Sequence, residues 1–166
     1  MKKLISFFSF FVILCSCSSD VKFNNPGFQA RKDNFNWKAD LTNGKIQNGK
    51  IVLEAFLGTE KVTMSVPAPL SNILQSNPVI HKFGITVDEP FNDNQATYKN
   101  TVDGAILSYI TNTTASNGQL EITNFNLSTR KLSGKFRFNA TYQGVNPAIA
   151  TNVNFQEGFI FDVLVY

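Results

Sequence analysis

The feature that most constrains the fold is a strict alternation of apolar and polar residues along several segments of the chain. In residues 131–142, Phe136, Phe138 and the positions in phase with them alternate with polar residues such as Lys135 and Arg137. Successive side chains of an extended strand point to opposite faces. The pattern therefore predicts strands that have one buried face and one solvated face.

The alternation and the turn signals between the alternating segments predict a domain built from short strands. The pattern recurs at residues 28–31, 35–42, 50–57, 61–66, 105–111, 119–127 and 152–166. Asn48-Gly49 is favoured over Asn43-Gly44 as a hairpin turn, and both residues of such a pair tolerate positive φ. Nine or ten strands joined by short turns predict a single antiparallel domain, either a β-sandwich or a closed barrel.

The alternation also leads to expectations about local structure. The alternation changes phase near Thr123-Asn124, and the last strand carries Glu157-Gly158, so we expect a bulge at each place. Residues 35–42 show no such change, and we expect one strand there with Phe35, Trp37, Ala39 and Leu41 on one face. Residues 70–75 follow two prolines, and we expect a short helical turn.

The N-terminus has the pattern of a bacterial lipoprotein signal peptide. Lys2 and Lys3 precede an apolar run over residues 4–14, which is shorter than the about 20 residues that a membrane span requires. Such signals end in an aliphatic residue at position −3, a small residue at −1 and the cysteine that is lipidated. Leu14 and Ser16 place Cys17 in that position.

Cys15 fits the lipidation pattern poorly because Leu14 would occupy its −1 position. A Cys15–Cys17 disulfide would be strained, and the chain has only these two cysteines. We therefore expect residues 1–16 to be the signal peptide, residues 17–27 the lipidated cysteine and a tether, and residues 28–166 the β domain. The acyl chains would hold the protein on a membrane, and we expect the outer membrane, with the leaflet undecided.

Charge and size exclude some classes of function. Cleavage before Cys17 removes 16 of the 166 residues and leaves 150, enough for one domain. Loss of Lys2 and Lys3 lowers the basic count from 15 to 13, against 12 acidic residues, so the net charge is about +1. No block of basic residues could follow a phosphate backbone, and nucleic acid is not expected as a partner.

The candidate catalytic and metal-binding residues are few. His81 is the only histidine, and we expect it on the solvent side of a strand as an ordinary surface or rim residue. Oxygen atoms of Asp88, Glu89, Asp93 and Asp103, with Asn92 and Asn94, could bind calcium, although their spacing matches no known motif. No spacing of carboxylates indicates a hydrolase. We expect no catalytic residue, no metal and no cofactor.

Four aromatic residues are the candidates for a ligand-stacking platform: Trp37, Tyr98, Tyr109 and Tyr142. Trp37 and Tyr142 are in phase with apolar neighbours, which indicates the core. Tyr98 is less constrained, and we expect it to be the best candidate for an exposed aromatic residue.

Several motifs resemble those of a known family. They are the lipobox with residues 25–30, the Trp37-Lys38-Ala39 segment, residues 134–140 and residues 158–161. In these the chain is similar to small, uncharacterised lipoproteins of Bacteroidota that are assigned to a domain of unknown function. The resemblance implies an all-β lipoprotein and brings no activity, ligand or catalytic residue. In such bacteria acids after the lipidated cysteine can direct surface export; here only Asp20 follows closely, which leaves exposure open.

The sequence leads to three hypotheses about function. The first is a lipid-anchored, non-enzymatic envelope protein that binds or scaffolds an unknown envelope protein or glycan. The second is a lipoprotein that binds a small ligand, either a glycan or an apolar molecule, in a barrel mouth or on exposed aromatics. The third is an enzyme, which would need acidic residues gathered with His81 in a deep pocket.

Overall fold

The computed structural model describes residues 27–85, 92–114 and 117–166, and the regular structure in these ranges consists of β-strands. The strands are β1 (Gly27–Lys32), β2 (Phe35–Lys38), β3 (Leu41–Gln47), β4 (Lys50–Leu57), β5 (Glu60–Pro67), β6 (Val79–Phe83), β7 (Gln95–Val102), β8 (Ala105–Ile110), β9 (Asn117–Asn126), β10 (Lys131–Tyr142) and β11 (Asn152–Leu164). The predicted all-β class is confirmed, with eleven strands where nine or ten were predicted.

All eleven strands belong to one curled, open sheet. Nine follow the order β2-β1-β11-β10-β8-β7-β5-β4-β3, and β9 and β6 extend from β10 as a branch. The branch forms because β10 is long: its residues 131–139 pair with β9, and only Thr141 and Tyr142 pair with β8. The antiparallel pairing is as predicted, whereas the shape is a half-barrel and does not confirm a sandwich or a closed barrel.

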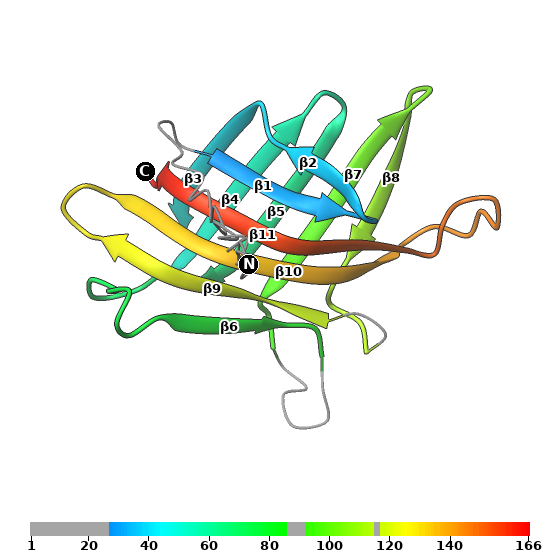
Figure 1. Cartoon of the computed structure of the whole chain (residues 1–166). Coiled ribbons are helices and arrows are strands. Elements are labelled where there is room, and N and C mark those ends of the chain that lie inside the picture. Colours follow the sequence, from blue (N-terminus) through cyan, green and yellow to red (C-terminus); the bar gives the residue numbers. More distant parts are fainter. Residues whose placement is uncertain (1–26, 86–91, 115–116) are drawn as a thin grey trace, which may run out of the picture.

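The curl divides the sheet into two facing halves (Figure 1). We call β1, β2, β6, β9, β10 and β11 the front half, and β3, β4, β5, β7 and β8 the back half. In Figure 1 the front strands run across the picture, and the back strands cross behind them obliquely. The halves are joined continuously where β10 pairs with β8.

A second link joins the halves at the end of the chain. Gly44 of β3 forms a parallel bridge with Val165. The Ile46 amide donates to the Tyr166 carbonyl at 2.7 Å, and the Tyr166 amide donates to the Gly44 carbonyl at 3.0 Å. A side chain at Gly44 would bring Cβ to 2.7 Å from the Leu164 carbonyl oxygen. Gly44 therefore permits this close approach, which explains its place within a strand.

Tight turns confirm several sequence predictions. Asn48 and Gly49, both at positive φ (52° and 73°), form the two-residue turn between β3 and β4, as predicted. Asp33 and Asn34 at φ 48° and 69° form the equivalent turn between β1 and β2. Positive φ at both central residues gives the turn the twist that suits a two-stranded hairpin.

Two predictions about local structure are wrong. Residues 35–42 do not form one strand, because the chain changes partner: the Ala39 amide donates to Phe28 in the front half, and the Asp40 amide donates to Phe56 in the back half. Phe35 and Leu41 are consequently exposed, whereas Trp37 is buried. Residues 70–75 form no helical turn, because the amide and carbonyl of Ile73 both pair with Phe125.

The core lies between the two halves and follows the predicted alternation. The bulge in β9 is confirmed, since Ser133 pairs with Asn124 but Gly134 pairs with Ile122, which leaves Thr123 unmatched. The bulge at Glu157-Gly158 is also confirmed by a shift of register against β10. The largest fully buried side chains are Phe28, Phe125, Phe155, Ile51, Leu53, Met64, Leu120, Ile122, Leu132, Val62, Val66 and Val163.

Candidate functional site

The four aromatic residues that could have formed a platform lie in the interior. Trp37, Tyr98 and Tyr109 are buried, and Tyr142 packs against the core. The prediction that Tyr98 is exposed is wrong, because only 4% of its surface is accessible. Its ring lies 5.5 Å from Phe155 and 5.6 Å from Tyr109, between the two halves. The rings that could have lined an internal binding site thus fill that space themselves.

A polar cluster beside these rings links the two halves. Glu60 of β5 pairs with Lys32 of β1, and its other oxygen accepts a hydrogen bond from the Trp37 indole at 2.6 Å. The Lys32 ammonium also donates to the Tyr98 hydroxyl at 3.0 Å. Burial, and then the charge of Glu60, raise the pKa of that hydroxyl well above its usual value. Each of these polar groups forms an ion pair or a hydrogen bond with another member of the cluster, which indicates a structural role.

Among the candidate metal ligands that the structure describes, the carboxylates are not brought together. Asp88 and Glu89 lie outside the described residues. Asp93 and Asp103 lie at opposite ends of β7, and eight strand residues extend roughly 26 Å. The side-chain amides of Asn92 and Asn94 donate to the Lys82 carbonyl at 3.0 and 3.2 Å. Within the described ranges, no group of three or more histidine, cysteine or acidic side chains could hold a metal ion.

His81 lies on an edge strand but points to the inner side, contrary to the predicted solvent side. It pairs with Leu120 and is in phase with buried Phe83. Its Nε2 atom is buried, and no described residue forms a hydrogen bond with it. Loss of hydration lowers the pKa of the imidazole. A histidine with this environment is held in its neutral form by packing and is a poor candidate for the base of a catalytic site.

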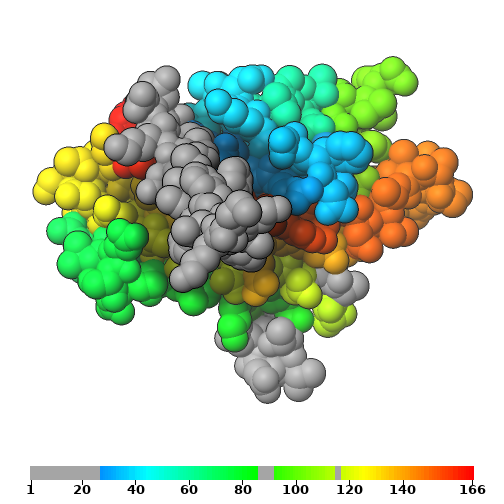
Figure 2. All heavy atoms as spheres, viewed as in Figure 1, coloured from blue at the N-terminus to red at the C-terminus, as the bar shows by residue number. Residues whose placement is uncertain are grey.

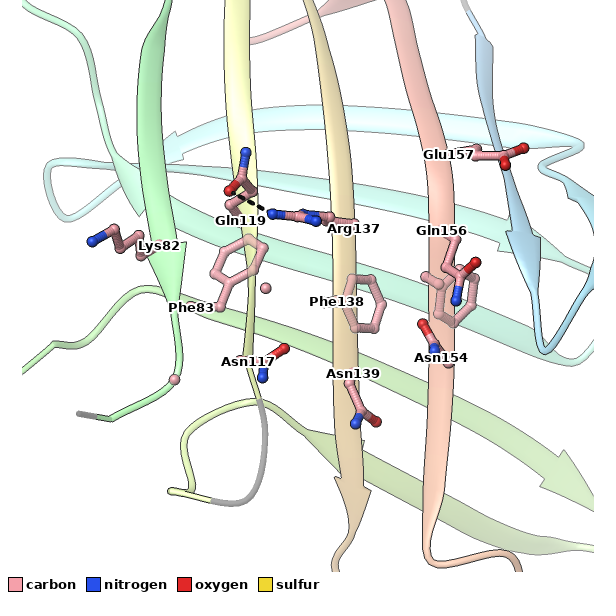
Figure 3. Close-up of a pocket in the computed structure, with 13 residues that line it drawn as sticks. Lys82, Phe83, Asn117, Gln119, Arg137, Phe138, Asn139, Asn154, Gln156 and Glu157 are labelled. Carbon is pink, nitrogen blue, oxygen red and sulfur yellow. Dashed lines mark hydrogen bonds between the residues drawn. The ribbon is translucent and has the colours of Figure 1, made fainter.

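The solvent side of the front half carries the most developed surface features. Phe138 and Phe155 point into the core, so their neighbours along β10 and β11 point outward. Over these strands lies an open hollow of about 710 Å³, the main hollow, whose lining includes Gln119, Arg137, Asn139, Asn154 and Gln156. Figure 3 shows Asn117, Asn139 and Asn154 in one row across β9, β10 and β11. The pairing of Asn139 with both other residues fixes that row.

A β-bulge shapes the hollow. Phe136 pairs with Gly158 and Phe138 with Phe155, so Arg137 lies opposite two residues, Gln156 and Glu157. Glu157 has a φ of 50° and lines the main hollow and two neighbouring hollows of about 210 and 400 Å³. Bulges commonly redirect side chains in this way. The three hollows therefore form one continuous surface, which we call the outer face.

The outer face carries an exposed aromatic residue that the sequence reasoning missed. Phe159 lies between Lys135 of β10 and Gln29 of β1 and is 43% exposed. It lines both smaller hollows. The signal in the sequence was the bulge itself: the extra residue reverses the phase of β11, so Ile160 turns inward and Phe159 turns outward.

Positive charge is concentrated on the outer face. Five cationic side chains and two carboxylates line the three hollows: Lys82, Lys135, Arg137, Arg31 and Lys38, with Glu121 and Glu157. The four ion pairs found among the described residues involve none of these cations. Within the part of the chain that the structure describes, Arg137 donates only to the Gln119 amide oxygen, at 3.4 Å. Its guanidinium is therefore available to an anion.

One amide on this face is not satisfied. The side-chain oxygen of Asn139 is buried and has no hydrogen-bond partner among the residues that the structure describes. Leaving a buried polar atom unpaired is costly. This oxygen is enclosed at the centre of the row of asparagines, next to Arg137. The turn between β9 and β10 and the loop between β10 and β11 lie at opposite ends of this side of the molecule (Figure 2).

Comparison with known families identifies the domain. Residues 24–164 match the model of a domain of unknown function, DUF6252. The chain belongs to this family. The predicted kinship with an uncharacterised domain family is thereby confirmed, and membership brings no activity, ligand or catalytic residue to the outer face. No curated protein and no solved structure matches the chain significantly.

Residues 27–85, 92–114 and 117–166 contain no helix with the length and hydrophobicity of a membrane span. Cys17 and the signal peptide predicted before it lie outside the described residues.

Proposed function

We propose that this protein is a lipid-anchored, non-enzymatic component of the bacterial cell envelope that binds another envelope component through its outer face. The observation that supports this most directly is the continuous run of three hollows with five cations, none of which forms an ion pair with another described residue. Charged side chains on a folded surface usually find partners or spread apart. A concentration of unpaired cations around hollows is typical of a surface that receives a ligand.

The proposed anchor is consistent with this role. Cys17 lies ten residues before Gly27, and an extended chain of that length reaches about 35 Å. Gly27 begins β1 and pairs with Phe161 of β11, the strand that carries Phe159 and Glu157. An anchor at Cys17 would therefore hold the outer face close to the membrane from which the tether starts. We infer a lipoprotein of Bacteroidota, as the sequence motifs indicate.

Site-specific photo-crosslinking in cells tests the binding role. A photoreactive amino acid is placed at Gln119 or Lys135 on the outer face, and at Thr63 or Lys99 on the solvent side of the back half as controls. We expect crosslinked products from the outer-face positions only. Equal crosslinking from both sides, or products from the controls alone, would contradict the proposal.

Lipidation is tested separately by Cys17→Ala. We expect the variant to accumulate with its signal peptide uncleaved and to lose the incorporation of radioactive palmitate that the wild-type protein shows. Cys15→Ala is the matched control and should be processed normally. If Cys17→Ala is still labelled with palmitate, the assignment of the anchor is wrong.

A further inference from the structure

We propose that the outer face binds an acidic oligosaccharide, with a carboxylate held by Arg137 and a sugar ring stacked on Phe159. This inference rests on the binding role proposed above and specifies its ligand. It follows from three independent features of the face: the hydrogen-bonding groups of its amides, its exposed aromatic ring and its unpaired positive charge.

The amides match the chemistry of sugar hydroxyl groups. Asn117, Asn139 and Asn154 occupy adjacent strands at directly opposed positions, which places them about 4.8 Å apart. Each amide offers two N–H donors and one carbonyl acceptor. A hydroxyl group both donates and accepts, so a row of amides can bind successive hydroxyls without a fixed polarity.

Phe159 supplies the apolar contact that a sugar ring requires. A pyranose ring has a face of C–H groups, and such faces pack against the π surface of aromatic side chains. Phe159 is exposed and lies between Lys135 and Gln29. Polar groups and charges of both signs surround the ring, since Glu157 lines both hollows around Phe159 and Glu121 lines one of them. They can contact the rim of a sugar stacked on the ring.

The charge of the face selects an acidic ligand. The mature protein has a net charge of about +1, yet the three hollows contain five cations and two carboxylates. The remainder of the domain is therefore slightly negative. Arg137 lies within the main and second hollows, and its planar guanidinium can bind a carboxylate through two parallel hydrogen bonds.

An anionic membrane surface would use the same charges but not the rest of the site. Lipid headgroups in a bilayer form a broad, nearly flat layer, and contact with it requires only cations at a protein surface. The amide row lines a hollow. Only a ligand that projects hydroxyl groups into the hollow satisfies that row. An oligosaccharide fits both the charge and the amides.

The test is isothermal titration calorimetry on the full lipidated protein in detergent micelles. The probes are hexamers of galacturonate and mannuronate, together with their methyl esters, which remove the negative charge and keep the sugar. We expect at least one acid form to bind. The affinity of its methyl ester should be lower by about tenfold, as loss of a charged hydrogen-bonded pair implies. Failure of both acid forms to bind, or equal binding of the esters, overturns the proposal.

Variants connect the binding to the named residues. Arg137→Gln should weaken binding of the acid form about tenfold and have little effect on binding of the ester. Phe159→Ala should weaken both forms by a similar factor, because stacking does not depend on ligand charge. Lys99→Gln, which removes an exposed cation from the back half, is the matched control and should change neither. An equal effect of Lys99→Gln and Arg137→Gln would show only a general charge effect and overturns the proposal.

The failure of this inference can be separated from failure of the proposed function. Crosslinking from Gln119 and Lys135 without oligosaccharide binding would leave the binding face in place and reject its proposed ligand. Arg137-dependent binding to vesicles of phosphatidylglycerol, without binding of either oligosaccharide, would assign the cations to lipid headgroups and would also reject it. Absence of crosslinks from the outer face would reject the binding role itself.

Discussion

The solvent sides of the two halves of the sheet differ in regularity. In the back half, β3, β4, β5, β7 and β8 pair without any shift of register, and charged groups meet across the strands. The Lys61 ammonium, for example, lies 2.6 Å from a carboxylate oxygen of Glu54. In the front half, the register shifts in the pairing of β1, β9 and β10 with their neighbours.

The difference explains where the hollows lie. Regular pairing places side chains on adjacent strands directly opposite one another, so opposite charges can neutralise each other. A bulge sets two residues against one, and the side chains around it lose their partners. Arg137, Glu157 and Phe159 all lie at or beside such a bulge. Irregular pairing, rather than a loop, is therefore what makes the outer face available for binding.

The largest expected effect tests whether the two halves share one core. Phe155 of the front half packs on Tyr98 of the back half and on Trp37, and it is fully buried. Phe155→Ala should lower the free energy of unfolding by about 3–5 kcal/mol. Phe159→Ala on the outer side of the same strand should change it by less than about 0.5 kcal/mol.

Urea denaturation followed by tryptophan fluorescence and by far-UV circular dichroism measures both variants. We expect one coincident transition by the two probes, because both halves lose their packing together. Two separate transitions would mean that the halves are independent domains.

The second effect compares glycines of the two halves. At Gly134 in the front half, a Cβ atom would lie 2.5 Å from the Glu121 carbonyl oxygen, because strands approach closely at the bulge. Gly134→Ala should cost about 2–3 kcal/mol. Gly104, in the β7–β8 turn, has a φ of 80° and open space around it, so Gly104→Ala should cost about 1 kcal/mol. Chemical denaturation gives both values, and the reverse order would contradict the close packing of the bulged strands.

The third effect compares a paired with an unpaired carboxylate. The hydrogen bond from Lys61 lowers the pKa of Glu54, against the opposing effect of burial. A lowered pKa in the folded state means that Glu54 contributes stability above its unfolded value and loses it as the pH falls through the folded value. Glu54→Gln should therefore cost about 0.5–1 kcal/mol at pH 7, and the cost should vanish in acid.

Glu121, on the outer face, forms no ion pair among the described residues. Glu121→Gln is the matched variant and should have almost no effect on stability at either pH. Thermal unfolding of both variants at neutral and acid pH would reveal the contrast. A larger loss for Glu121→Gln would show that charges of the front half stabilise the fold.

The smallest effect concerns His81 at the edge of the front half. Burial lowers the pKa of its imidazole, so the unfolded chain takes up a proton at higher pH than the folded protein does. The protein should lose some stability as the pH falls from about 7.5 to about 5.5, through the usual histidine range. His81→Gln should remove that part of the pH dependence. An unchanged pH profile in the variant, measured by thermal unfolding, would contradict the role of His81.

Sequence patterns predicted the positions and buried sides of the strands better than they predicted which strands pair with each other. The alternation in β10 identified its buried side, and the phase change in β9 located a bulge, because both depend on positions within one strand. The break at Ala39-Asp40 could not be predicted, since it reflects a change of pairing partner from Phe28 to Phe56. The helical turn predicted at residues 70–75 was wrong for the same reason: Ile73 is held by distant Phe125.

The candidate site was predicted less well than the fold. The aromatic residues Trp37 and Tyr142 were correctly assigned to the core, but Tyr98 was not. Its burial depends on the contact of its ring with Phe155, which the pattern of a single strand does not show. The outer face depends on β9, β10 and β11 lying side by side, and single-strand patterns do not determine that order. The asparagine row is formed by residues 117, 139 and 154, whose spacing in the sequence gives no signal.

The pairing of β1 with β11 has a consequence for the order in which the protein folds. Asp33 accepts a hydrogen bond from the amide of Asn154, 121 residues later. Contacts between such distant residues close a very large loop, which slows folding. We expect β1 and β2 to gain protection in pulsed hydrogen-exchange experiments no earlier than β11, and earlier protection would contradict this order. The first strands to be synthesised would thus be completed last, after residues 152–164 have emerged.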